Sequence, residues 1–322
     1  MAKKEQELVV ATPAVPLGYR QLGTQVAGHT FEASNAAAVG LLQDAGREGR
    51  VFKPLGKPDC GMREIRFYES LAAATDASGD ADDDLALLAS LAEHVPRYYG
   101  QLKLVVNQRE HTFLQLEDLT HGMARPCVMD VKIGQRTWDP LSSPHKREIE
   151  QQKYAMCKQN LGLCLPGFQV YQEQEQQSGG KTILIRHGRD YGKSLDVEGF
   201  RQALALFFNV QHANAKDSPL LREVLCQLRG IQSWFKRQRL LHFYASSLLI
   251  CYDFDRLSNP HPTQQNGYHR EQREKPPDQW IRVRCIDFAH IFPAADAQPD
   301  ENYMFGLQSL IDIVESMLES LR

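Results

Sequence analysis

The segment from Pro126 to Gly134 carries an aspartate and a lysine two residues apart inside an apolar run. A β-strand points successive side chains to opposite faces, so Asp130 and Lys132 would project together from one face. The opposite, core-facing side would present Cys127, Met129, Val131 and Ile133. Phosphoryl transfer to an alcohol uses a carboxylate that orients or accepts the hydroxyl proton and a cation that offsets phosphate charge. A surface ion pair on an edge strand is the alternative interpretation, and the residues alone leave both open.

A second acidic residue, Asp287, stands at the end of an apolar strand pattern and is followed by Phe288. A carboxylate at a strand end can hold Mg²⁺, which takes oxygen ligands and keeps waters and substrate phosphates in its shell. An aspartate that caps a turn is the competing interpretation.

A lysine, Lys53, lies within the short strand pattern 51–55, and Glu64 follows on the next predicted helix. Kinases place a strand lysine on the nucleotide phosphates and pair it with a helix glutamate. A lysine in a strand is often simply solvated, and the chain contains no Walker A sequence. The pair Gly28-His29 is a weak candidate for a loop that covers phosphates.

The residues Leu116 to Leu119 stand where a predicted strand ends. Backbone N–H and C=O groups exposed at such a strand end can hydrogen-bond the edge of an adenine ring. An ordinary acidic turn explains Glu117 and Asp118 equally well.

Basic residues accumulate on a helix predicted from a Ser-Pro start at 143 to about 159. Lys146 and Lys153 are seven positions apart, about two turns, and would share one face that could hold a polyphosphorylated ligand. Glu148 and Glu150 mix acidic charge into the segment, which for this helix alone favours a solvated charged face.

The elements that must position these residues follow from hydrophobic periodicity. Strands are predicted over 51–55, 102–108, 112–117, 127–133, 168–174, 181–186, 240–252 and 280–288. A helix is predicted over 62–73, and a short one that ends at 91 follows it. Further helices are predicted over 143–159, from 196, from 218, and near the C-terminus from about 307. This order predicts a disordered arm (1–16), a smaller β-rich lobe (17–118) and a larger α+β lobe (119–322) with a flexible insertion (256–279). Ligands commonly bind in the cleft between such domains.

Composition narrows the function classes. The net charge of −3 over 322 residues does not favour a general nucleic-acid binder, so cations for a polyanion must be gathered locally. The basic run 236–239 is better explained by a helix C-terminus than by DNA binding. Seven cysteines without a CxxC pair do not favour a disulfide framework or a zinc site. No apolar run approaches the roughly 20 residues of a membrane span, and the start lacks the apolar core of a signal peptide.

Together these motifs resemble the inositol polyphosphate kinase family. Its hallmark PxxxDxKxG is present from Pro126 to Gly134. Two further family motifs follow in the expected order, Ser246-Ser247-Leu248-Leu249 and Ile286-Asp287-Phe288. The continuation from Ile133 to Pro140 looks most like the multikinase branch rather than the trisphosphate 3-kinases or hexakisphosphate kinases.

The resemblance implies a two-lobed, protein-kinase-like α+β fold that uses ATP and Mg²⁺. The nucleotide would be held by Lys53, Glu64, Glu117, Asp118, Leu119 and Asp130. The metal ligands would be Asp287 and Ser247, and the inositol phosphate would contact Lys132, Lys146, Lys153 and His290. Asp130 and Lys132 would be the catalytic pair, with Asp130 either holding the ribose or orienting the attacking hydroxyl. Where the family carries glutamines between its substrate lysines, this chain places Gln151 and Gln152, so specificity for ring positions stays open.

The expected activity is direct in-line transfer from ATP to inositol trisphosphate and tetrakisphosphate, towards pentakisphosphate. Another branch of the family and a non-catalytic inositol-phosphate scaffold are the alternatives. A phosphoinositide headgroup is a further candidate ligand, and we expect a monomer in the nucleus and cytoplasm.

Overall fold

The structure is a computed structural model that describes residues 15–31, 38–46, 49–77, 82–174, 181–211, 218–257 and 279–321. The predicted arm (1–16) and insertion (256–279) lie almost entirely outside the described residues. Within the described ranges, no helix combines the length and apolar composition that a bilayer crossing requires.

The first sheet is antiparallel, with strand order β1-β2-β3-β5-β4. Its strands are β1 (Tyr19–Gln21), β2 (Leu42–Asp44), β3 (Arg50–Pro54), β4 (Tyr98–Val106) and β5 (Arg109–Glu117). The helices inserted between its strands are α1 (Pro58–Asp76), α2 (Asp83–Ser90) and the 3₁₀ turn η1 (Leu91–His94). Phe52 and Phe113 are fully buried in a small apolar cluster within this sheet, which fixes the register of β3 against β5.

The second sheet is also antiparallel, with order β11-β10-β6-β7-β8. Its strands are β6 (Pro126–Ile133), β7 (Leu163–Gln174), β8 (Lys181–His187), β10 (Ser247–Asp253) and β11 (Ile281–Ile286). Strand β6 is central, so Asp130 is not on an edge, and its residue is only 6% exposed. The surface ion pair considered from the sequence is therefore wrong.

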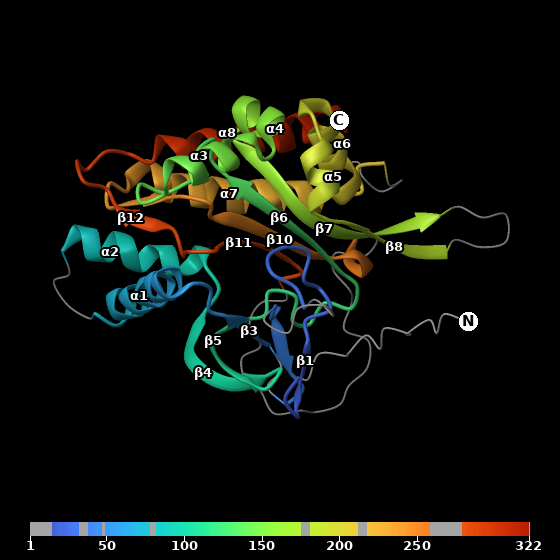
Figure 1. Cartoon of the computed structure of the whole chain (residues 1–322). Coiled ribbons are helices and arrows are strands. Elements are labelled where there is room, and N and C mark those ends of the chain that lie inside the picture. The colour runs from blue at the N-terminus through green and yellow to red at the C-terminus, as the bar shows by residue number, and fades with distance from the viewer. Residues whose placement is uncertain are drawn as a thin grey trace, which may run out of the picture.

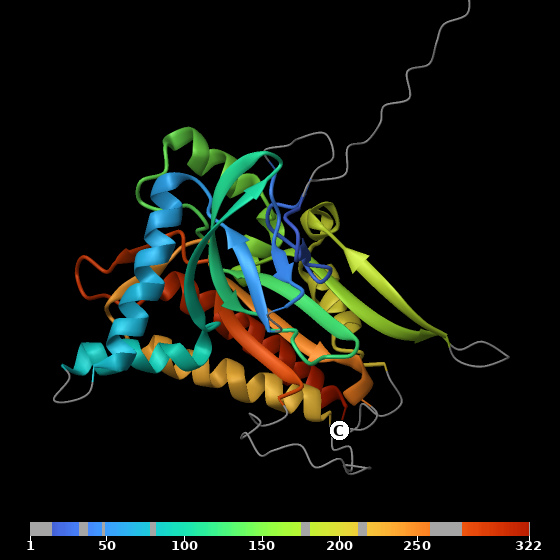
Figure 2. The same ribbon diagram turned by 90° about the horizontal axis from the view of Figure 1, so that it is seen from below.

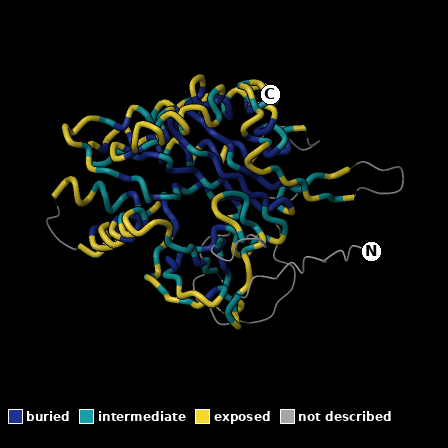
Figure 3. Tube along the Cα trace, in the orientation of Figure 1, coloured by how far each residue is buried: buried dark blue, intermediate teal, exposed yellow. Residues whose placement is uncertain are grey.

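Helices cover the face of the second sheet that points away from the first sheet (Figure 1). They are α4 (Ala155–Leu161), α5 (Arg189–Ser194), α6 (Val197–Phe207), α7 (Pro219–Arg237) and α8 (Glu301–Ser320). Helix α3 (Pro144–Gln152), which precedes α4, has no buried residue and is not part of this layer. The four predicted core residues of β6 are fully buried in one cluster with the apolar stripes of α6, α7 and α8. Figure 3 shows that burial concentrates in this second sheet and its helices. The remaining elements are β9 (Leu241–Phe243), β12 (Ile291–Pro293) and the 3₁₀ turn η2 (Phe254–Arg256).

The α+β class is confirmed, but two predicted elements are wrong. The helix predicted over 143–159 is broken, because Lys153 is extended and Tyr154 adopts a left-handed backbone with φ 55°. The side chain of Lys158 donates to the carbonyl of Glu150, which satisfies a group left free by the break. The strand predicted over 240–252 is split by Ala245, also left-handed at φ 52°, into β9 and β10.

Candidate active site

A cavity of about 250 Å³ lies between the two sheets. Seen from the side of the first sheet, β3 and β5 lie in front of β6 and β10 (Figure 2), and all four strands contribute to the lining. Six residues predicted from the sequence to bind nucleotide or metal line this space: Lys53, Glu117, Asp118, Leu119, Asp130 and Asp287. The structure therefore brings together residues that are up to 234 positions apart.

Lys53 joins the two sheets through two carboxylates. Its Nζ lies 2.7 Å from Glu64 Oε1 and 2.6 Å from Asp287 Oδ1. Glu64 is buried on α1, and its Oε1 also accepts the amide of Phe288 at 3.1 Å. Burial by itself would lower the pKa of Lys53, but the charges of Asp287 and Glu64 outweigh it and raise that pKa well above its usual value. Lys53 is thus a permanent cation, held at the cavity wall where nucleotide phosphates would lie.

The carboxylates of Asp130, on β6, and Asp287, directly after the end of β11, both line the cavity. Burial, reinforced by the charge of Asp287, raises the pKa of Asp130 to about 6, while Lys132 opposes the rise. Burial would also raise the pKa of Asp287, but Lys53 and Lys132 reverse the effect and hold it below its usual value. Both groups are therefore mainly ionised near neutral pH, and their mutual repulsion favours the binding of a cation.

Two buried oxygens beside Asp287 fit a divalent metal. Asp130 Oδ1 and Ser247 Oγ are buried and make no well-formed hydrogen bond to a described residue, although Ser247 lies close enough to Asp130 to lower the pKa of its carboxyl. A buried polar atom without a partner costs free energy, which a bound group can restore. The described residues contain no cluster of three or more His, Cys, Asp or Glu side chains that could enclose a metal. A sparse set of oxygen donors suits Mg²⁺, which completes its shell with waters and substrate phosphates.

The other end of the cavity is apolar and has backbone groups suited to a nucleobase. Leu119, Val128 and Leu249 form its walls, and all three belong to one apolar cluster. The amide of Glu117 donates to Arg97 O and that of Asp118 to Gly49 O, each at 2.9 Å. These bonds leave the carbonyl of Glu117 and the amide of Leu119 as the groups that an adenine edge would use.

Asp118 has a local structural role. Its Oδ1 accepts the amide of Thr120 at 2.8 Å and the hydroxyl at 2.7 Å, and its Oδ2 accepts Gln43 Nε2 at 2.9 Å. The carboxylate is buried and engaged, so it shapes the turn between the two sheets. This placement agrees with the turn interpretation of the sequence.

Of the residues predicted to hold the acceptor, Lys132 lies on β6, and Lys146 and Lys153 follow it along the chain. Lys132 Nζ donates to Ala245 O at 2.8 Å. Lys146 is exposed on α3, whereas Lys153 lies after the end of that helix and pairs with Glu150 Oε1 at 2.7 Å. The predicted single helical face carrying both lysines is therefore wrong, although both basic groups lie on the segment that follows β6.

The sequence did not indicate a partner for His290. Its Nδ1 lies 2.5 Å from Oδ2 of the buried Asp139, whose other oxygen, Oδ1, accepts the Ser142 hydroxyl at 3.0 Å. Burial lowers the pKa of His290, and the charge of Lys146 adds to this, while Asp139 opposes both. Asp139 therefore orients the imidazole of His290. No role was predicted for Asp139 from the sequence, because its only visible feature was its position before Pro140.

The loop 22–29 of the first sheet closes over the second sheet. Arg186 Nη2 donates to Gly23 O at 2.8 Å, and Arg189 Nη2 donates to Gly28 O at 3.5 Å. The loop approaches Gly167 so closely that a Cβ at that glycine would lie 2.1 Å from Val26 O. Gly28 and His29 line the cavity, as expected for a loop that covers phosphates, but neither arginine was singled out from the sequence.

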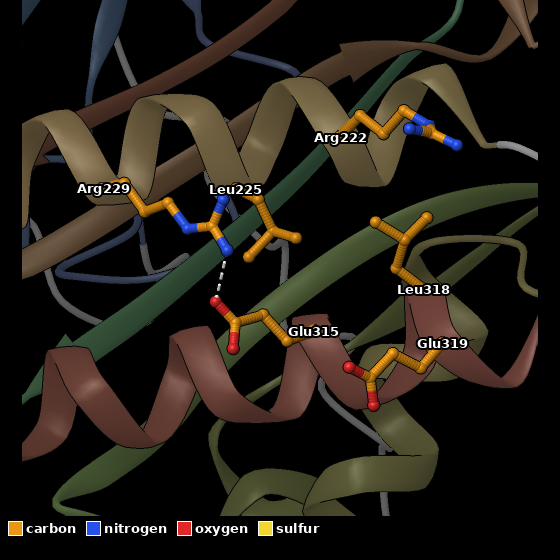
Figure 4. A pocket seen from close by; sticks show the side chains of 6 residues that line it. All are labelled: Arg222, Leu225, Arg229, Glu315, Leu318 and Glu319. Atoms are coloured by element: carbon orange, nitrogen blue, oxygen red, sulfur yellow. Dashed lines mark hydrogen bonds and ion pairs between the residues drawn. The ribbon is translucent and has the colours of Figure 1, made fainter.

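A second hollow lies between α7 and α8, away from the cleft (Figure 4). It is lined by Arg222, Leu225, Arg229, Glu315, Leu318 and Glu319. Arg229 Nη2 pairs with Glu315 Oε1 at 2.7 Å across it. None of the residues predicted for the site lines this hollow, so we do not assign the chemistry to it.

Comparison with known proteins identifies the family of the chain. Residues 113–315 match the family model described as inositol polyphosphate kinase. The chain is 34% identical over 258 residues to the inositol polyphosphate multikinase of Mus musculus, covering 79% of this chain and 59% of that protein. It is 28% identical over 315 residues to multikinase beta of Arabidopsis thaliana, covering 92% and 93%. The crystal structure of S. cerevisiae Ipk2 with ADP and Mn²⁺ matches with a TM-score of 0.61 at 24% identity, over 84% of this chain and 99% of that one.

Proposed function

Because this chain belongs to the inositol polyphosphate kinase family, we propose that it transfers the γ-phosphoryl group of ATP to hydroxyls of inositol trisphosphate and tetrakisphosphate. The curated relatives described above are named multikinases, which favours this branch. The observation that carries the proposal is the ion-pair network across the cleft. Lys53 bridges Glu64 and Asp287, and Asp130 lies on the opposite wall of the same cavity.

The nucleotide would lie along the cavity from the apolar end to the charged end. Leu119, Val128 and Leu249 would pack against adenine, and the carbonyl of Glu117 would accept from its amino group. Lys53 would neutralise phosphate charge without moving, because two carboxylates already hold its ammonium in place. The yeast relative was crystallised with ADP and Mn²⁺, which is consistent with nucleotide use in this fold.

The reacting groups would meet between Asp130, Lys132 and Asp287. Asp287 and Ser247 would hold Mg²⁺, which would offset the charge that develops on the transferred phosphoryl group. Asp130, with a pKa of about 6, is basic enough to accept a hydroxyl proton and is mainly ionised at neutral pH. Lys132 would neutralise charge on the acceptor side. Transfer needs no covalent enzyme intermediate, because positioning and charge neutralisation suffice.

The test is a product profile. Purified protein is incubated with γ-labelled ATP, Mg²⁺ and each inositol phosphate in turn, and the products are separated by HPLC. We expect labelled tetrakisphosphate and pentakisphosphate from trisphosphate and tetrakisphosphate acceptors. Lys132→Ala should reduce the rate by about 10²–10⁴-fold, the usual scale for a lost charge-stabilising group.

The matched control is Lys103→Ala, since Lys103 is an exposed lysine that pairs with Glu110 on the first sheet. This variant should keep the wild-type rate. Label found only in products made from inositol hexakisphosphate would instead support the hexakisphosphate kinase branch. Transfer to no inositol phosphate would exclude the proposed activity.

A further inference from the structure

Two lysines contact Glu150 on the segment that follows β6, where the acceptor lysines were predicted. Lys153 Nζ lies 2.7 Å from Glu150 Oε1, and Lys158 Nζ donates to the main-chain carbonyl of Glu150. Burial alone would raise the pKa of Glu150, but Lys153, Lys158 and Lys132 outweigh it and hold it below its usual value. The hydroxyl of Thr137 donates to the other carboxylate oxygen at 3.4 Å. Glu150 is therefore a fixed anion within a group of cations.

The break between α3 and α4 creates this arrangement. An uninterrupted helix would not leave the Glu150 carbonyl to Lys158, nor place Lys153 on an extended residue beyond the helix end. Lys158 is buried, and its pKa is lowered by burial and by the charges of Lys153 and Lys132, while Glu150 opposes the effect. The glutamate thus supplies the negative charge that lets these lysines lie close together.

Lys132 connects this segment with the reacting groups. It follows Asp130 by two residues on β6 and pairs with Ser247 of β10 in the register of the sheet. Its charge lowers the pKa of both Asp287 and Glu150. The glutamines that the sequence suggested for acceptor recognition, Gln151 and Gln152, are exposed. Glu150 is only 23% exposed at its side chain and is the α3 residue paired with the lysines.

A phosphate group and a carboxylate compete for the same lysine donors. A phosphate monoester carries a charge of about −1.5 to −2 near neutral pH and binds ammonium groups as a point charge. In the present arrangement Glu150 already occupies Lys153, and its charge would repel a phosphate brought beside it. An acceptor with fewer phosphates can avoid this position, whereas a fully phosphorylated ring cannot.

On the basis of the function proposed above, we propose that Glu150 is a specificity-determining residue of the acceptor site. Its carboxylate takes the place of one acceptor phosphate at Lys153, and so disfavours the most highly phosphorylated inositols. Removing this charge while keeping the shape of the side chain should therefore relax the discrimination.

The experiment measures equilibrium binding of inositol trisphosphate and inositol hexakisphosphate by calorimetry, without ATP, to the full chain. Glu150→Gln should lower the ratio of the hexakisphosphate Kd to the trisphosphate Kd by about tenfold, as expected when one repulsive contact is removed. The charge-retaining variant Glu150→Asp should keep the ratio within about twofold of wild type. Glu148→Gln removes one charge from the same helix at an exposed position and should also leave the ratio unchanged.

Melting curves establish that each variant is folded, and Glu150→Ala replaces Glu150→Gln if the latter is not. An unchanged ratio in the charge-removing variant overturns the inference, as does an equal shift in Glu148→Gln, which would indicate bulk charge alone. Failure of wild-type protein to bind either compound also overturns it. Binding with the expected ratio but no phosphoryl transfer would contradict the proposed kinase activity and leave the role of Glu150 standing.

Discussion

Replacing Asp130 with asparagine should stabilise the fold while it removes most of the turnover. The carboxylate is buried at 6% exposure, and its Oδ1 makes no well-formed hydrogen bond to a described residue. Asparagine has nearly the same shape but carries no charge to be desolvated or repelled by Asp287. A residue kept only for structure would show losses of stability and of activity together.

The size of the stabilisation follows from the pKa of Asp130. Burial and the charge of Asp287 raise it from 3.8 to about 6, which corresponds to a cost of roughly 3 kcal/mol for the ionised form in the folded state. Protonated Asp130 therefore stabilises the fold fully below about pH 4, and this contribution is lost as the pH rises through about 6. The free energy of unfolding of Asp130→Asn should exceed that of wild type by up to about 3 kcal/mol at pH 7.5, and the difference should disappear near pH 4.

The assay combines urea denaturation with steady-state kinetics. Denaturation is measured between pH 4 and 7.5 without metal or nucleotide, so that the charges are those of the protein alone. Turnover with inositol trisphosphate should fall by about 10²–10⁴-fold, or about 3–5 kcal/mol of transition-state stabilisation. A fall in kcat supports the proton-accepting role of Asp130, whereas a rise confined to the KM for ATP supports contact with the ribose.

The control is Asp190→Asn, because Asp190 is 99% exposed at its side chain. This variant should change neither stability nor turnover. The reasoning is refuted if Asp130→Asn destabilises the protein at pH 7.5, or if it retains near-normal turnover.

Lys53→Gln leaves two carboxylates without their shared cation, so it should destabilise the fold by about 3 kcal/mol and raise the KM for ATP. Urea denaturation and ATP kinetics measure both effects, with Lys103→Gln as the control. An unchanged KM for ATP would contradict the prediction. Gly167→Ala places a Cβ 2.1 Å from Val26 O and should cost about 1–3 kcal/mol while weakening ATP binding, whereas Gly188→Ala meets nothing within 4 Å and should do neither. Chelation of divalent metal should abolish transfer and added Mg²⁺ should restore it; activity that survives chelation would exclude the metal role of Asp287.

The sequence was most informative where local pattern and chemistry coincide. Strand β6 has alternating apolar residues, so the shared face of Asp130 and Lys132 followed from a period of two. The shift in its pairing with β7 between these two residues was not predicted. The pairing of Lys53 with Glu64 was expected from a strand lysine followed by a helix glutamate. Its contact with Asp287 came only with the fold, since 234 residues separate the two.

Long-range contacts and unusual backbone conformations could not be predicted in the same way. Tyr154 and Ala245 adopt left-handed backbones that nothing in their residue types favours, and each interrupts a predicted element. The hydrogen bond between Asp139 and His290 joins residues 151 positions apart. The contacts of Glu150 with Lys153 and Lys158 depend on the break between α3 and α4. Helical periodicity assumes an unbroken helix, so it predicted that Glu150 lies on a solvated helix face.

The most direct test of the account is a crystal structure of the chain with a non-hydrolysable ATP analogue, Mg²⁺ and inositol trisphosphate. We predict adenine between Leu119 and Val128, phosphates at Lys53, metal bound by Asp287, and an acceptor hydroxyl near Asp130. A nucleotide bound outside the cavity between the two sheets, or an acceptor on the far side of the molecule from Asp130, would contradict it.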